Sequence, residues 1–562
     1  MGKILTSVVF CLLILQVNAQ KQLPKNRFGL LEATKEYQEE LQKIPYQKVK
    51  LLNGTNINGK NTMPTSIDNS LHKFFPPIVS QISSSCGCAS NVHYIFSYEI
   101  NCLLNRDGKK PENIFNYMYI WNFLNEGIEK GTQTKDVLDM INSNGVIPKS
   151  IYQTSSTTEW VTGYNKYFSG MQYKIKSYTK FDPWKSGGLE GMKQYLIDHG
   201  DGSKFGGLIQ FSAFADPFEA SDYNGNSDTG LKSIIPRFGT NGMHSMTISG
   251  FDDSVWYDYN NNGEKDIEEM GAFICINSWG LNWGDKGKFY APYYTFTTLT
   301  QGNGGTGNGD VKSGGKCCFV LTPEIRDVKM TLKIKVSHTS RNDLTFEVGV
   351  NKNKDAKEPS FVKDFFPITN KGGDIYMRGD FQKDGTPPSD IYKSIEMGID
   401  ITDLCNFIGE DRFPTFFINI KDENKGNPGE GEIVYCTLTD YRTNPATEYI
   451  AEIENSELSP RKGKLIKINT QPRVDIKLAK DIIGVDTHVK GNVLNLFIKS
   501  NTPTKADAKI INKDGIIIAT IFENRIVNNE TIEWKSTNAM PGKYIVRVST
   551  DDQVICEIIE IK

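Results

Sequence analysis

The stretch Asn277-Ser278-Trp279-Gly280-Leu281-Asn282-Trp283-Gly284 decides the fold of this 562-residue chain. An asparagine can hold a catalytic histidine in one tautomer, because its amide oxygen accepts a hydrogen bond from one ring nitrogen. A nearby indole such as Trp279 can shield that hydrogen bond from water. The stretch therefore predicts that Asn277 orients a histidine supplied by another part of the chain.

The histidine with the most informative surroundings is His244, one of six in the sequence. Its context, Gly242-Met243-His244-Ser245-Met246-Thr247-Ile248-Ser249-Gly250-Phe251, is typical of a strand entered through a turn. His93 and His199 are weaker candidates. We predict that His244 is a general base and that Asn277 fixes its ring.

A nucleophile is predicted where Ser83-Ser84-Ser85-Cys86-Gly87-Cys88-Ala89-Ser90-Asn91 leads into a helix. A thiol attacks as the thiolate, and its pKa falls at a helix N-terminus beside a protonated histidine. The serines can cap the helix, whose buried face is spaced at three and four residues. Cys88 would lie in the first turn, and the Gln81 amide could stabilise an oxyanion. The residues that give this spacing are Val92, Ile95, Phe96, Ile100 and Leu103.

These blocks, in the order Cys, His, Asn, resemble the papain and cathepsin family over roughly residues 64 to 300. The resemblance implies an α+β, two-lobed papain-like catalytic domain, with Cys88 on a helical lobe and the His–Asn pair on a strand-rich lobe. It also implies hydrolysis of protein or peptide substrates through an acyl-enzyme, without a catalytic cofactor. In that reaction Gln81 and the Cys88 N–H hold the oxyanion, and Trp279 screens the His244–Asn277 pair.

The nucleophile block departs from the family pattern in two ways. Ala89 replaces the usual Trp, and the interval from Gln81 is 88 − 81 = 7 or 86 − 81 = 5 residues, where the family has six. Either cysteine fits. We favour Cys88 because it directly adjoins the helix, whereas Cys86 occupies the place of the family's disulfide-forming cysteine.

Two other activities are compatible with the altered block. A catalytically inactive papain-like protein could serve binding or adhesion at the cell surface. A transglutaminase-like acyl transferase is disfavoured, because such enzymes usually have Asp where this chain has Asn277.

An acidic insertion predicts a structural calcium site. His244 and Asn277 are 277 − 244 = 33 residues apart, more than is usual for the family, and the extra residues match the pattern D-x-[DN]-x-[DN]-G-x₅-E. Oxygen ligands at these positions suit Ca²⁺, and Gly263 suits the sharp turn. The alternative is a solvated acidic hairpin tip between two strands. The predicted ligands are Asp258, Asn260, Asn262, Glu264, Asp266 and Glu269.

The N-terminus and the composition predict a secreted or cell-surface protein. Residues 1–19 have the basic, apolar and small-residue order of a signal peptide, with cleavage after Ala19; the alternative is an anchor helix. Residues 20–63 form a polar pro-segment or leader. A net charge of −3 excludes the basic footprint of nucleic-acid binding. The ten cysteines, less Cys11 and one nucleophile, leave eight, which permits several disulfides.

The second half of the chain is predicted to be all-β. After the catalytic domain at 64–300, a glycine-rich loop and last strand cover 301–325, a β-sandwich covers 326–460, and a C-terminal β domain covers 463–562. The two β regions could instead form one continuous sandwich. The last domain resembles the sorting domains of type IX secretion, which implies contact with outer-membrane secretion machinery; the alternative is a plain accessory domain.

Overall fold

A computed structural model defines the fold. It describes residues 27–31, 34–51, 63–216, 218, 220–297, 318–369, 371–379, 390–408, 414–423, 430–451, 453, 456–458, 463–470, 483–500, 503–512, 516–535, 541–550 and 554–561. The predicted signal peptide and the glycine-rich stretch 301–315 lie outside these residues. Within them, no helix is long and apolar enough to cross a membrane.

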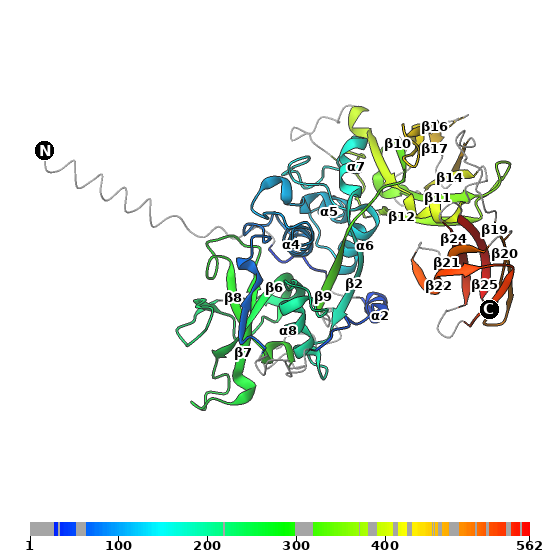
Figure 1. Cartoon of the computed structure of the whole chain (residues 1–562). Helices are drawn as coiled ribbons and strands as arrows, with labels where there is room; N and C mark the ends of the chain where they lie inside the picture. Colours follow the sequence, from blue (N-terminus) through cyan, green and yellow to red (C-terminus); the bar gives the residue numbers. More distant parts are fainter. Residues whose placement is uncertain are drawn as a thin grey trace. The chain divides into compact units, whose positions relative to one another are not determined.

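The chain divides into two compact units (Figure 1). The first contains the residues up to Thr158 and Tyr173–Ile325; the second contains Glu159–Gln172 and Arg326–Lys562. Residues Glu159–Gln172, predicted from the sequence to lie in the catalytic domain at 64–300, belong to the second unit. Helix α7 (Tyr164–Met171) belongs to the second unit because it packs on strand β13 (Ser394–Asp400). A Cβ on Gly398 would lie 3.0 Å from the Cβ of Tyr167, so this close packing depends on glycine.

The main helix of the first unit begins at the cysteine block. Segments α3 (Cys86–Cys88), the π-helical η2 (Ala89–Phe96) and α4 (Ser97–Leu103) follow one another without a break. Residues 86–101 are all buried, as expected for a helix that runs through the centre of a domain. The unit's other helices are α2 (Lys35–Lys43), η1 (Asn69–Leu71), η3 (Pro111–Asn113), α5 (Tyr117–Leu124), α6 (Thr134–Asn144), α8 (Gly188–Asp198), η4 (Ile267–Glu269) and α9 (Tyr294–Thr297).

A nine-stranded sheet forms the rest of the first unit, in the order β2-β9-β3-β6-β7-β8-β5-β4, with β1 paired to β6. In the antiparallel β6–β7 pair Thr247 lies opposite Ile276, so the start of β6 and the end of β7 meet at one end of the sheet. His244 and Asn277 lie at that end. The strands are β1 (Ser66–Asp68), β2 (Tyr173–Phe181), β3 (Ile209–Asp216), β4 (Ser221–Asp222), β5 (Ser233–Ile234), β6 (Asn241–Trp256), β7 (Met270–Ile276), β8 (Lys288–Pro292) and β9 (Cys318–Ile325).

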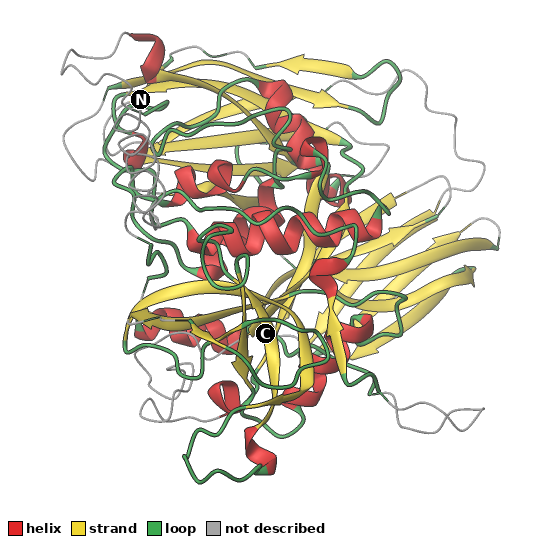
Figure 2. Ribbon diagram, turned by 90° about the vertical axis from the view of Figure 1, so that its left-hand side faces the viewer, coloured by secondary structure: helices red, strands yellow, loops and turns green. Residues whose placement is uncertain are grey.

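The second unit begins with two antiparallel sheets, ordered β13-β10-β15-β16 with β17 paired to β15, and β12-β11-β14-β18. Leu332, Ile334 and Val336 alternate along β10 with less buried residues and are themselves buried, as expected for a strand with one face in a core. Strands outnumber helices over the described chain (Figure 2). The strands and short helices are β10 (Met330–His338), η6 (Arg341–Asp343), β11 (Leu344–Asn351), β12 (Phe361–Thr369), η7 (Asp390–Lys393), η8 (Thr402–Phe407), β14 (Thr415–Asp422), β15 (Gly431–Asp440), β16 (Thr447–Ile450), β17 (Glu457–Leu458) and β18 (Gly463–Asn469).

The C-terminal strands form two further sheets, β19-β20-β23 and β22-β21-β24-β25. They share a core in which Leu494, Leu496, Ile498, Val546 and Val548 are buried. The overall class is therefore α+β, followed by antiparallel β-sheet modules, as expected from the sequence. The strands are β19 (Ile483–Lys490), β20 (Val493–Ser500), β21 (Thr504–Ile511), β22 (Ile517–Val527), β23 (Glu530–Lys535), β24 (Gly542–Ser549) and β25 (Val554–Ile561).

Candidate active site

A buried hydrogen bond joins His244, near the start of β6, to Asn277, directly after β7. Nε2 of His244 is 2.8 Å from Oδ1 of Asn277, and neither side chain is exposed. Because an amide oxygen only accepts, we assign the ring proton to Nε2. The Asn277 oxygen also accepts from the Ser278 N–H at 2.7 Å, which fixes its orientation. Nδ1 is then the basic nitrogen, and it is buried without a hydrogen-bond partner among the described residues.

The indole of Trp279 covers this pair. Its ring centroid lies 4.8 Å from that of His244, with the planes inclined by 35°, and the side chain is 3 % exposed. Trp283 packs edge-on against Trp279 at 5.3 Å. A hydrogen bond kept away from water in this way is electrostatically stronger than an exposed one. The structure thus places Trp279 where it can hold the His244–Asn277 geometry.

Burial decides the charge of His244. Loss of solvent lowers the pKa of the imidazole to about 4, and the nearby Arg27 cation acts in the same direction. The hydrogen bond to Asn277 opposes this shift of the pKa without cancelling it. In the described arrangement the ring is therefore neutral at neutral pH, as a general base must be before it takes a proton.

The two candidate cysteines face different surroundings. Cys86 is the first residue of α3, and its thiol is within reach of the backbone of Ser245, the residue after His244. Cys88 is the third residue of α3, and its thiol interacts with the Thr132 hydroxyl instead. Burial raises the pKa of the Cys86 thiol to about 11, which the backbone of Ser245 partly offsets, and raises that of Cys88 well above its ordinary value. Of the two, Cys86 is the one beside the strand that carries His244.

Gln81 is tied to the asparagine block. Its Oε1 accepts from the Ser278 hydroxyl at 2.5 Å, and its backbone N–H donates to the Ser278 carbonyl at 2.8 Å. Its Nε2 donates to the Ser83 carbonyl at 2.7 Å and lies 3.4 Å from the Arg27 carbonyl. The sequence alone had assigned no role to Ser278, which orients both Asn277 and Gln81.

Solved structures of papain-like cysteine proteases are similar to this chain. Xylellain, a cysteine protease from Xylella fastidiosa, is 16% identical over 55% of this chain and 100% of its own, with a TM-score of 0.34. The procathepsin L2 proteinase from the Tenebrio molitor larval midgut is 15% identical over 57% and 90%, with a TM-score of 0.34. The bromelain protease from Ananas comosus, in complex with the E64 inhibitor, is 13% identical over 46% and 99%, with a TM-score of 0.30. No family model and no curated protein matches the sequence.

Residues 27–31 of the predicted leader lie across the site. The Leu30 N–H donates to the carbonyl of Met243, next to the histidine, at 3.2 Å. The Leu31 N–H donates to the Thr132 carbonyl at 3.1 Å, and the Thr132 N–H donates to the Gly29 carbonyl at 2.9 Å. These backbone bonds hold the segment between Met243 and Thr132, and Leu30 forms an isolated parallel bridge with Thr132. The sequence shows no sign of this placement of residues 27–31, because the hydrogen bonds that hold them are made by backbone groups.

Side chains of the same segment cover the histidine. The Phe28 ring lies 6.4 Å from His244 and 6.1 Å from Trp279, both edge-on, and the Arg27 guanidinium lies 4.9 Å above Trp279. Gly29 passes the cysteine block closely enough that a Cβ would lie 1.9 Å from the Ser84 carbonyl oxygen. Only glycine fits this position, so the segment's path depends on the absence of a side chain there.

The predicted calcium loop joins β6 to β7, as expected. The Asp258 carboxylate accepts from the N–H groups of Asn262 at 3.1 Å and Gly263 at 2.8 Å, and Gly263 has a φ of +78°. The Asp266 carboxylate accepts from the side-chain amides of Asn260 at 3.0 Å and Asn262 at 2.9 Å.

The other two predicted ligands are placed differently. The buried Glu269 carboxylate accepts from Trp256 Nε1 at 2.9 Å and from the Tyr259 N–H at 3.1 Å. Glu264 lies in the turn, where its N–H donates to the Asn262 side chain at 2.8 Å. Over the described residues, no three His, Cys, Asp or Glu side chains are grouped as a metal site requires. The oxygen donors are of the class that Ca²⁺ takes, and they share one tight loop.

Three other sequence expectations concern histidines and cysteines. His93 is buried with Nε2 2.8 Å from the Pro77 carbonyl, and His199 pairs with Glu99 at 2.8 Å, so neither shares the site of His244. The expected disulfides are not formed among the described cysteines Cys86, Cys88, Cys102, Cys275, Cys405, Cys436 and Cys556. Most of these are buried in the hydrophobic cores, where a thiol packs as a small apolar group.

Proposed function

We propose that the chain is a papain-like cysteine peptidase that hydrolyses protein or peptide substrates through an acyl-enzyme. The observation that carries the proposal is the buried His244–Asn277 hydrogen bond, 2.8 Å long, beside a cysteine at the first position of a buried helix. A base with a fixed tautomer next to a thiol at a helix N-terminus is the arrangement that nucleophilic catalysis by cysteine requires.

We further propose Cys86 as the nucleophile, in place of the Cys88 that the sequence favoured. The position of its thiol next to Ser245 supports this assignment, and so does the contact of Cys88 with Thr132. Helix geometry gives the reason. Residues two apart on a helix point in directions about 200° apart, so only one of the two thiols can face the strand of His244.

The reaction then runs in two steps. His244 Nδ1 first takes the proton of the Cys86 thiol. The resulting thiolate attacks the carbonyl carbon of the scissile bond, and the oxyanion that forms accepts hydrogen bonds from Gln81 Nε2 and the Cys86 N–H. His244 gives its proton to the leaving amine, so the C–N bond breaks and a thioester remains. His244 next takes a proton from water, which attacks the thioester; the acid product leaves and the thiol is restored.

Residues 27–31 act as a pro-segment in this proposal. The Arg27 carbonyl accepts a hydrogen bond from Gln81 Nε2, the donor that the oxyanion would need, and the Phe28 ring covers His244. The pKa of His244 is lowered and the pKa of Cys86 is raised. Both shifts favour a neutral imidazole and thiol over the imidazolium–thiolate ion pair of an active cysteine peptidase. The segment must leave before substrate can enter.

Matched histidine variants test the proposal. Chain freed of the segment is incubated with a peptide library, alongside His244→Ala and the control His72→Ala, whose ring lies outside the candidate site. We expect cleavage by the parent and by His72→Ala, and its loss in His244→Ala. No cleavage by folded parent protein would favour the alternative, a binding or adhesion protein with this fold.

We also propose that Ca²⁺ stiffens the loop 258–269. Asp258, Asn260, Asn262, Asp266 and Glu269 would supply side-chain oxygens, and Glu264 a backbone carbonyl. The support is that Asp258, Asn260, Asn262 and Asp266 share one tight loop on the connection between β6, which carries the histidine, and β7, which leads to the asparagine. When bound, the ion would offset the loop's negative charge and limit its motion.

Finally, we propose export through the N-terminal signal, with the C-terminal domain as a sorting module read by outer-membrane secretion machinery. The separate core of β19–β25 supports an independently recognised module. Deleting residues 470–562 and locating the product tests it. Retention of the truncated chain in the cell envelope is expected, and its continued export would contradict the sorting role.

A further inference from the structure

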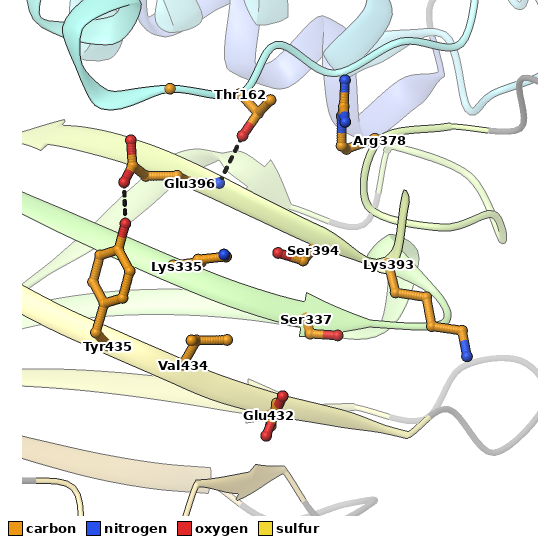
Figure 3. A pocket seen from close by; sticks show the side chains of 11 residues that line it. Thr162, Lys335, Ser337, Arg378, Lys393, Ser394, Glu396, Glu432, Val434 and Tyr435 are labelled. Atoms are coloured by element: carbon orange, nitrogen blue, oxygen red, sulfur yellow. Dashed lines mark hydrogen bonds between the residues drawn. The ribbon is translucent and has the colours of Figure 1, made fainter. Parts of the chain in front are cut away.

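A polar pocket of about 800 Å³ lies in the second unit, against the outer face of strands β10, β13 and β15 (Figure 3). Alternate residues of these strands point into the sandwich core, so the pocket is lined by the residues between them. Its floor carries Lys335 and Ser337 from β10 and Ser394 from β13, and Thr162 and Arg378 border it above (Figure 3). The pocket is far larger than a single small ion needs.

The Lys335 ammonium faces this pocket without a carboxylate partner. In the register of β10 and β13, Lys335 lies opposite Glu396, a pair that would normally form an ion pair across the strands. The Glu396 carboxylate is instead engaged by the Tyr435 hydroxyl and by the Tyr164 N–H at 2.6 Å. No hydrogen-bond or ion-pair partner of Lys335 exists among the residues that the structure describes.

A second cation, Arg378, also favours a negatively charged ligand in this pocket. Arg378 lines the pocket, and its Nε is buried with no hydrogen-bond partner in the described part of the chain. Its guanidinium rests on the Tyr392 ring at 5.5 Å, which limits its freedom. A buried donor without a partner is costly, and an anionic ligand would satisfy it.

The remaining lining favours a sugar. Thr162, Ser337 and Ser394 offer hydroxyl groups, and Val434 is the one aliphatic side chain among the described lining residues. The lining also includes the Lys393 ammonium, the Glu432 carboxylate and the Tyr435 ring. A pocket of this kind suits a ligand with many hydroxyls, whereas a peptide anchored by apolar side chains would need more apolar surface.

We propose that this pocket binds an acidic saccharide, with a ring-borne oxyanion on Lys335 and Arg378 and its hydroxyls on Ser337 and Ser394. The oxyanion can be the carboxylate of a uronic acid or a sulfate ester, since both present oxygens to the two cations. The accessory unit would then hold the protein on acidic polysaccharide, a role independent of any catalysis by the first unit.

Calorimetric titration of the intact chain tests the proposal with three tetrasaccharides: one from hyaluronan, one from heparin and a neutral one from chitin. We expect an acidic tetrasaccharide to bind, and Lys335→Gln and Arg378→Gln each to weaken it at least tenfold. The control is Lys333→Gln. That residue is on the same face of β10, but it pairs with Glu448 at 3.7 Å and does not line the pocket.

Binding of the hyaluronan tetrasaccharide, whose acidic groups are carboxylates alone, shows that a carboxylate suffices. Because heparin carries both carboxylates and sulfates, binding of the heparin tetrasaccharide alone shows that a sulfate is required. Three results would overturn the proposal: no binding of either acidic sugar at millimolar concentration, equal binding of the neutral sugar, or equal weakening by Lys333→Gln. Binding of poly-glutamate with no binding of the sugars would also overturn it. Melting curves of each variant check that the fold is kept, which is expected because none of the three residues is fully buried.

Discussion

Residues 27–31 cover the candidate active site, and we expect the single methyl group added by Gly29→Ala to displace them. In Gly29→Ala the new Cβ would lie 1.9 Å from the Ser84 carbonyl oxygen, well inside any tolerated contact, so the segment must leave its path. Three backbone hydrogen bonds hold the segment, those between Leu30 and Met243 and the two with Thr132. At about 1 kcal/mol each they contribute about 3 kcal/mol, or a factor of about 150 in the closed population.

We therefore expect Gly29→Ala to raise the alkylation rate of Cys86 by iodoacetamide about 100-fold at neutral pH. The rate is measured by peptide mass spectrometry on intact, folded protein. Gly484→Ala is the matched control, because a Cβ there meets only Lys499 Cβ, at an ordinary 3.7 Å. Leu30→Pro, which removes the N–H bonded to Met243, should give a smaller rise, about fivefold to tenfold. Equal rates in the parent and in both segment variants would refute the blocking role.

The other predictions concern the oxyanion donor, pH and calcium. In the Gly29→Ala background, Gln81→Ala should lower kcat by about 10² to 10³ with little change in KM, because its amide serves the transition state; a change confined to KM would contradict this. The pKa of buried His244 is lowered to about 4 against an ordinary 6.5, so the native state resists protonation and stability present above pH 6.5 is lost as the pH falls towards 4. Between pH 7 and pH 5 the parent should lose about 2 kcal/mol more unfolding free energy than His244→Gln in urea titrations, and equal losses would oppose the shift. Chelation should lower Tm, and Ca²⁺ at about 100 times its Kd should restore about 2.7 kcal/mol of unfolding free energy. The double variant Asp258→Asn/Asp266→Asn should show neither effect. Identical Tm values with and without chelator would exclude the site.

The His244–Asn277 pair could be predicted because each residue lies in a short sequence motif that indicates its chemical role. His244 lies near the start of β6, and Asn277 directly follows β7. The antiparallel pairing of these two neighbouring strands brings the two residues together, and this register is that of ordinary strand pairing. The alternating pattern of Leu332, Ile334 and Val336 likewise reflects which face of a strand is buried. In both cases side-chain identity alone carries the information.

The choice between Cys86 and Cys88 could not be made from spacing. It depends on which residue begins the helix, and the start of a helix is uncertain by as much as the two positions that separate Cys86 from Cys88. The blocking segment was also hidden, because it is held by backbone groups that every sequence has. The transfer of α7 to the second unit depends on close packing at Gly398, a contact between residues far apart in the chain.

Hydrolysis assays combined with mapping of the thiol adduct test the proposed peptidase mechanism most directly. In the Gly29→Ala background, Cys86→Ala and Cys88→Ala are assayed on a peptide substrate, and the iodoacetamide adduct of the parent is located by mass spectrometry. We predict an adduct on Cys86, loss of hydrolysis in Cys86→Ala and activity within a few-fold of the parent in Cys88→Ala. An adduct on Cys88 with activity retained in Cys86→Ala would contradict the assignment, and no hydrolysis by any folded variant would contradict the peptidase itself.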